Sequence, residues 1–168
     1  MSRRLFALLR TLIVAPAFVS LWLYFFPRWF GGQHLFDGPR SIYWLVATVG
    51  AVIGVPSVLA FAWRGLGTPA PFDPPRRLVV TGPYRWVRNP MYVGLGIVML
   101  GEVLVYPNLA RVMFIEMAVA LVLVSILVVF VEEPGLRKTF GSDYEEYCRN
   151  VGRWIPRLTP WYAPAHLD

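Results

Sequence analysis

The sequence predicts an all-α, polytopic membrane protein with about four transmembrane helices, followed by interfacial helices near the C-terminus on the cytoplasmic side. Hydrophobic residues make up 57% of the 168 residues, whereas a soluble domain is roughly half apolar. Several apolar stretches approach or exceed the roughly 20 residues with which a helix crosses a bilayer. The length fits one domain. We therefore expect residues 1–168 to form a single membrane unit, with two spans in 1–63 and the chemistry-bearing motifs in 64–158.

Four apolar segments predict the individual spans. They cover residues 5–27, 42–63, 91–106 and 110–131. The third segment is the shortest, and the sequence Tyr-Pro-Asn-Leu at 106–109 is typical of a turn. The third and fourth segments are therefore expected to form a tight helical hairpin.

The N-terminus allows two interpretations. Residues 2–6 (SRRLF) resemble a twin-arginine export signal, and residues 15–17 (APA) resemble a cleavage site. However, Arg10 interrupts the apolar region, which continues past that site to Phe26. We predict a retained first helix, with a cleaved signal as the alternative.

The positive charges predict the orientation of the spans. Arginines and one lysine gather before the first span, between the second and third, and after the fourth, and only Arg28, Arg40 and Arg111 fall on the other side. The positive-inside rule then places both termini and the 64–90 loop in the cytoplasm. The net charge of +6 is explained by this topology and by anionic headgroups, so we expect a membrane and no nucleic acid as partner.

Two short helices are expected after the last span. Pro134 suits the first turn of a helix and Gly141 its end, and Ser142 and Glu145 have the spacing of a capping box that opens the next helix. This second helix either lies on the membrane surface or packs on the protein's own loops, and the two interpretations are compatible. Its apolar residues recur every three or four positions: Phe140, Tyr144, Tyr147 and Val151.

Cysteine and histidine usage excludes several kinds of site. Cys148 is the single cysteine, which excludes a disulfide framework and a cysteine-based zinc site. The two histidines, His34 and His166, are far apart in the sequence. We therefore expect no metal.

The predicted topology brings distant polar residues to one cytoplasmic corner. The 64–90 loop, the start of the third span and the end of the fourth all meet there. The corner offers the carboxylates of Glu132 and Glu133 for a cation, arginines for an anion, aromatic faces, and glycines that permit close approach. This set suits a zwitterionic, purine-bearing cation such as S-adenosylmethionine.

Each of these features also has a structural interpretation. Headgroup water, Arg85 or Arg88 could neutralise the two glutamates. Gly94 and Gly96 have the spacing of small residues that let membrane helices pack closely, and they lack the strand–turn–helix context of a dinucleotide site. Three aromatic residues could form an interfacial belt: Tyr84, Trp86 and Tyr92.

Three motifs together resemble the integral-membrane methyltransferases, the superfamily of isoprenylcysteine carboxyl methyltransferases and phospholipid methyltransferases. They are GPY followed by RNPMYVG within 82–94, the Glu132-Glu133 pair, and the pattern FGxxYxxYxxxVxRxxP over 140–156. The resemblance covers about residues 65–158. It implies a helical membrane core with S-adenosylmethionine held at the cytoplasmic side under the C-terminal segments.

The chemistry of methyl transfer suggests roles for some residues, and the resemblance implies donor contacts for others. Arg153 is a candidate for positioning an anionic acceptor, or a topological anchor, and Glu133 or Tyr144 is a candidate base for an amine or thiol acceptor. Donor contacts carry over onto Arg76, Arg77, Leu78, Val79, Tyr84, Arg88, Asn89, Pro90, Met91, Tyr92, Gly94, Gly96, Glu132 and Glu133.

The expected function is methyl transfer from S-adenosylmethionine to a lipid or a small lipophilic acceptor. The carboxyl methyltransferases usually have His where this chain has Asn89, and an acceptor-binding Arg where it has Val128. Both differences disfavour a prenylcysteine carboxylate and leave the methylated atom open. The alternatives are an NADPH-dependent membrane reductase of the sterol-reductase type and a non-catalytic membrane subunit. We assign no role to Glu102 and Glu116: a buried acid within the hairpin would imply function, but both could reach the outer interface instead.

Overall fold

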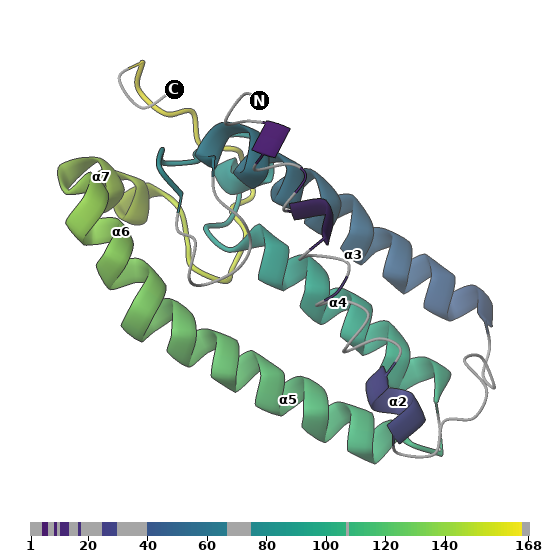
Figure 1. Cartoon of the computed structure of the whole chain (residues 1–168). Helices are drawn as coiled ribbons and strands as arrows, with labels where there is room; N and C mark the ends of the chain where they lie inside the picture. The colour runs from purple at the N-terminus through teal and green to yellow at the C-terminus, as the bar shows by residue number, and fades with distance from the viewer. Residues whose placement is uncertain are drawn as a thin grey trace.

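The computed structural model describes residues 5–6, 9, 11–13, 17, 25–29, 40–66, 75–106 and 108–165. Within these residues the regular structure is entirely helical (Figure 1). The elements are α2 (Phe26–Trp29), α3 (Arg40–Ala60), η2 (Phe61–Gly65), η3 (Gly82–Arg85), α4 (Pro90–Val105), α5 (Ala110–Leu127), η4 (Val128–Glu132), α6 (Glu133–Phe140) and α7 (Ser142–Asn150).

Among the residues that the structure describes, two helical segments are long and apolar enough to cross a membrane. They run over Leu45–Gly65 and Ala110–Phe140. In the most apolar stretch of each helix, only 17% of the residues are buried within the protein. That exposure is unlike the core helix of a soluble protein. They match the second and fourth expected spans, and α4, with 16 residues, is about 24 Å long and shorter than a typical hydrocarbon core. The expected first span at 5–27 lies mostly outside the described residues, so the four-span topology stays a prediction.

Glycines bring α3 and α4 into backbone contact. A Cβ atom on Gly94 would lie 2.7 Å from the backbone oxygen of Gly50 and 2.8 Å from Cα of Gly54. A Cβ on Gly50 would in turn lie 2.6 Å from the backbone oxygen of Gly94. Only residues without a side chain permit helix axes this close, so these glycines fix how α3 and α4 cross.

The predicted hairpin between the third and fourth apolar segments is confirmed. α4 ends at Val105, α5 begins at Ala110, and the amide of Leu109 donates to the backbone oxygen of Tyr106 across 2.9 Å. Figure 1 shows α5 diverging from α4 from this turn toward α6. The two helices are therefore closest near the turn, and at the other end the long side chains of Tyr92 and Glu132 bridge the wider gap.

The helix that follows α5 is continuous through η4 into α6. η4 is a π-helical turn, in which the amide of Glu133 donates to the backbone oxygen of Val128. The wider turn accommodates Pro134, which has no amide hydrogen to donate. As expected, Pro134 lies in the first turn of α6 and Gly141 ends that helix, at a φ of +53°.

The expected capping box is wrong. α7 already begins at Ser142 with Gly141 as its N-cap, and no side chain caps it. The Ser142 hydroxyl lies against Asp143, and Glu145 pairs with Arg137. The positive φ of Gly141 turns the chain so sharply that Ser142 is inside the first turn, where its side chain cannot act as a cap.

The apolar face of α7 packs on the protein's own loops, as one of the two interpretations predicted. Tyr144, Tyr147 and Val151 form a buried cluster with Val80, and Leu78 packs against it. The tail beyond α7 also contributes to this packing, because the ring of Trp161 lies 5.8 Å from that of Tyr147. The loop before α4 and the C-terminal helices therefore form one small packed layer.

Candidate functional site

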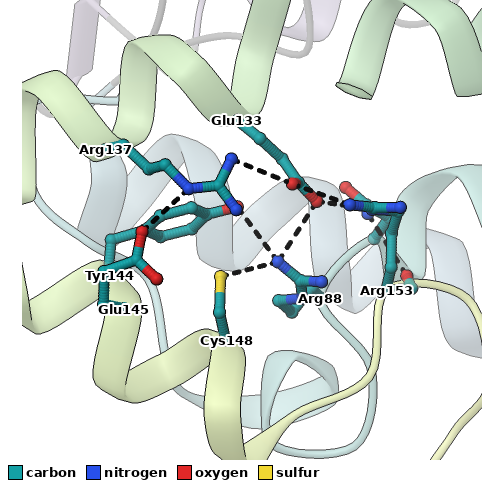
Figure 2. A network of polar contacts seen from close by, with 8 residues as sticks. Arg88, Glu133, Arg137, Tyr144, Glu145, Cys148 and Arg153 are labelled. Carbon is teal, nitrogen blue, oxygen red and sulfur yellow. Dashed lines mark hydrogen bonds and ion pairs between the residues drawn. The ribbon is translucent and has the colours of Figure 1, made fainter. Parts of the chain in front are cut away.

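Glu133 lies at the centre of a network of arginines at the start of α6 (Figure 2). Its side chain is 2% exposed, and its Oε1 atom lies 2.6 Å from Nε of Arg153 and 3.1 Å from Nη1 of Arg88. Its Oε2 atom accepts a hydrogen bond from Nη2 of Arg153 at 2.9 Å and lies 3.4 Å from Nη1 of Arg137. The Arg153 pair is bidentate, which is the strongest geometry for such a contact. Both oxygens of Glu133 are therefore occupied by cations.

Arg88 joins the loop before α4 to α7. Its Nη1 atom lies 2.6 Å from Sγ of Cys148 and 3.4 Å from Oη of Tyr144, in addition to its contact with Glu133. Burial raises the pKa of the Cys148 thiol, although the Arg88 charge opposes that shift. The Nε atom of Arg88 is buried and has no hydrogen-bond partner, which leaves one donor available within the network.

Glu132 has a different environment from its neighbour. Its carboxylate accepts a 2.6 Å hydrogen bond from the hydroxyl of Tyr92, in the first turn of α4. The ring centroid of Tyr92 lies 6.5 Å from that of Trp154. Glu132 is half-buried, and among the described residues no cation pairs with it. One carboxylate of the Glu-Glu pair is therefore saturated with cations and the other is not.

The segment after α7 lies along the loop that precedes α4. The amide of Arg88 donates to the backbone oxygen of Gly152 at 2.9 Å, and Nδ2 of Asn89 donates to that of Arg153 at 3.2 Å. The hydroxyl of Tyr147 donates to the backbone oxygen of Tyr84 at 2.7 Å. Burial raises the pKa of the Tyr84 phenol, so this ring is a neutral support beneath the loop.

These contacts bring together six of the residues that the sequence singled out: Arg88, Asn89, Tyr92, Glu132, Glu133 and Arg153. Arg76 and Arg77 are exposed, and Leu78 and Val79 turn inward. Leu78 packs against the cluster that contains Tyr144, but none of the four makes a described polar contact with Glu133; Arg76 donates its amide to the backbone oxygen of Gly65 at 2.7 Å instead. Their expected contact with a donor stays a prediction.

The remaining motif residues have packing roles in the described structure. Gly94 contacts α3, and a Cβ on Gly96 would lie 3.4 Å from Cδ2 of Leu121 on α5. Pro90 is buried and Met91 is half-buried at the start of α4. Packing alone explains both glycines, and their expected donor contacts stay predictions.

Sequence reasoning missed Arg137, Cys148 and Trp154 as members of this site. Arg137 follows Glu133 by four residues, and this i,i+4 spacing on a helix could have identified it. Trp154 lies in an irregular segment, where no periodicity indicates a partner.

Glu102 and Glu116 are buried, at 3% and 6% exposure, rather than at an interface. Each has a carboxylate oxygen without a hydrogen-bond partner. Ten residues of α4 separate Glu102 from Tyr92, which is about 15 Å along a helix. These acids therefore lie apart from the Glu133 network.

Comparison with known proteins identifies the family. Residues 45–143 match the family described as phospholipid methyltransferase. No curated protein and no solved structure matches the chain. The matched segment runs from α3 to the start of α7, contains Arg88, Tyr92, Glu132 and Glu133, and covers more than half of the chain. The chain therefore belongs to the phospholipid methyltransferase family, and it is a membrane methyltransferase by that membership.

Proposed function

We propose that the protein is an S-adenosylmethionine-dependent methyltransferase that acts on a lipid or small lipophilic acceptor within the membrane. The observation that carries the proposal is the contrast between two adjacent carboxylates. Glu133 is neutralised by three arginines, whereas Glu132 receives only the Tyr92 hydroxyl and, among the described residues, no cation. A half-buried carboxylate without a protein cation suits a cationic group of a ligand.

The groups around Glu132 fit a zwitterionic donor. Glu132 would take the ammonium or sulfonium charge, and the unpartnered Nε of Arg88 would take the carboxylate. The rings of Tyr92 and Trp154, 6.5 Å apart, offer aromatic faces for the sulfonium or the adenine. When bound, S-adenosylmethionine supplies an activated methyl group.

The protein's own contribution is positioning and exclusion of water. Because both oxygens of Glu133 are bound by arginines, its carboxylate is a poor proton acceptor. We therefore assign Glu133 and Arg153 a positioning role: their bidentate pair fixes the C-terminal segment, and with it Trp154, beside Tyr92. Holding two reactants in line in a dry site supplies most of the acceleration that a donor of this kind needs.

The acceptor we favour is a phospholipid-type molecule rather than a prenylcysteine carboxylate. Val128, one helical turn before Glu132, is 1% exposed and uncharged. The nearby arginines Arg88 and Arg153 are engaged by Glu133. At this turn of the helix the described residues therefore offer no further cation, beyond those bound by Glu133, for the reacting carboxylate of a prenylcysteine.

We place this site on the cytoplasmic side of a multi-pass protein. Arginines dominate the 64–90 loop and the region after residue 132, and the positive-inside rule puts such segments in the cytoplasm. The donor is then available from the cytoplasm and a lipid acceptor from the bilayer.

Calorimetry with purified protein tests donor binding. Glu132→Gln removes the charge but keeps the shape, and the loss of one charge-assisted contact is expected to weaken S-adenosylmethionine binding by about tenfold to a hundredfold. Glu145→Gln is the matched control, because Glu145 is an exposed carboxylate whose described ion pair is with the exposed Arg137. Equal binding by wild type and Glu132→Gln would count against the proposal. Thermal stabilisation by NADPH but not by S-adenosylhomocysteine would favour a reductase instead.

A further inference from the structure

The segment after α7 presents large apolar side chains to the outside. Ile155 is 81% exposed and Leu158 is 97% exposed. Arg157 lies between them in sequence, and its guanidinium donates to the backbone oxygens of Asn150 and Thr159. Apolar side chains this exposed in one short stretch indicate a surface that something apolar covers.

The backbone of this segment is fixed. Amide hydrogen bonds of 2.9 Å join Arg157 to the backbone oxygen of Trp86 and Trp161 to that of Arg85. At the other end, a Cβ atom on Gly152 would lie 2.7 Å from the backbone oxygen of Ile155, so the chain makes a tight turn there that only glycine permits. The exposed side chains between these anchors are therefore held in place.

The location of the segment identifies what covers it. Arg153 pairs with Glu133, the residue directly after η4, and the last residues of η4 include the exposed Phe130 and Val131, at 72% and 54%. Ile155 follows Arg153 by two residues, which an extended chain spans in about 7 Å. Figure 1 shows the C-terminal chain, in yellow, passing between α4 and the helix that runs from α5 to α6. The exposed residues of the segment thus lie within a few residues of the ion pair that joins it to the exposed, apolar end of a membrane-spanning helix.

We propose that residues 154–158 insert Ile155 and Leu158 into the cytoplasmic leaflet of the bilayer and form the lipid-side wall of the site. A cation between two apolar side chains suits the headgroup level, where the apolar groups enter the leaflet and Arg157 stays at the interface. Trp154, on the inner side of the same turn, contacts Tyr92. The same segment therefore contacts lipid on one side and the candidate donor site on the other. The role as a wall for the acceptor rests on the proposed function; the insertion does not.

Insertion is tested with a fluorescent probe in vesicles. The full-length protein carrying Leu158→Cys, labelled with an environment-sensitive dye and reconstituted in phosphatidylcholine vesicles, is compared with Ser142→Cys at the exposed corner between α6 and α7. The labelled wild type is measured in parallel, because Cys148 is native. We expect blue-shifted emission at 158 and quenching by lipids with acyl-chain nitroxides that is several-fold stronger than at 142. Equal quenching at the two positions overturns the proposal. A blue shift without lipid quenching also overturns it, because it would indicate that a second copy of the chain, and not lipid, covers Leu158.

The acceptor wall is tested by kinetics with the acceptor presented in vesicles. Leu158→Glu is expected to raise KM for the vesicle-borne acceptor about tenfold and to leave donor affinity unchanged, whereas Thr159→Glu at the neighbouring exposed position changes neither. An unchanged KM in Leu158→Glu overturns the proposal that residues 154–158 form a wall for the acceptor. If the wild type transfers no methyl group at all, the proposed function fails, while the quenching result still decides the insertion.

Discussion

Replacement of Glu133 by Gln tests the network at the start of α6. Removing one partner of a buried ion pair costs about 3–5 kcal/mol, because a buried charge is left uncompensated. Arg137 and Arg153 keep 43% and 35% of their side-chain exposure and can be rehydrated, whereas Arg88 is only 10% exposed. The cost therefore falls at the lower end, about 3 kcal/mol.

Thermal unfolding followed by tryptophan fluorescence measures this loss. For a chain of this size about 3 kcal/mol corresponds to a fall in Tm of roughly 6–12 °C. Glu145→Gln is the matched control, because its partner Arg137 and Glu145 itself are exposed by 43% and 47%, and surface pairs contribute about 1 kcal/mol or less. If both variants shift Tm equally, Glu133 is not the centre of the network.

Three further predictions concern packing and the thiol. Gly94→Val is expected to lower Tm strongly, since a Cβ there would lie 2.7 Å from a backbone oxygen of α3, whereas Gly135→Ala, whose Cβ would meet no atom within 4 Å, leaves Tm unchanged or slightly higher; similar melting curves for the two variants would contradict the glycine contact. Tyr147→Phe leaves the backbone oxygen of Tyr84 without its 2.7 Å buried hydrogen bond, and denaturant titration should show a loss of about 1–3 kcal/mol rather than none. Burial raises the pKa of the Cys148 thiol, so less thiolate is present at a given pH. The alkylation rate of Cys148 should therefore still rise with pH where the rate of a free cysteine has levelled off. A pH profile like that of free cysteine would refute the raised pKa.

The sequence predicted the apolar architecture well. The segments 42–63 and 110–131 correspond to helices over Leu45–Gly65 and Ala110–Phe140, and the turn at 106–109 joins α4 to α5 as expected. These features depend on long apolar runs and turn residues, which are local properties of the sequence. Pairing with Arg88 is one of the structural interpretations that the sequence allows for the two glutamates, and Glu133 makes that contact.

The arrangement of the site could be predicted only in part. Apart from Arg137, four residues further along α6, nothing local distinguishes Glu132 from Glu133, because the other two arginines, Arg88 and Arg153, come from distant segments of the chain. The C-terminal segment pairs with the 85–88 loop through backbone hydrogen bonds, which carry no side-chain signature. The capping box failed for a related reason, since one glycine with positive φ moved the start of α7.

Transfer of a labelled methyl group tests the central claim most directly. The purified protein in proteoliposomes is incubated with S-adenosylmethionine labelled in its methyl group and with total membrane phospholipids, and the lipid fraction is extracted and separated. The account predicts label in a lipid product with the wild type and at least about tenfold less with Glu132→Gln, in line with the loss of one charge-assisted contact. Donor binding without label in any lipid or lipophilic product would contradict it.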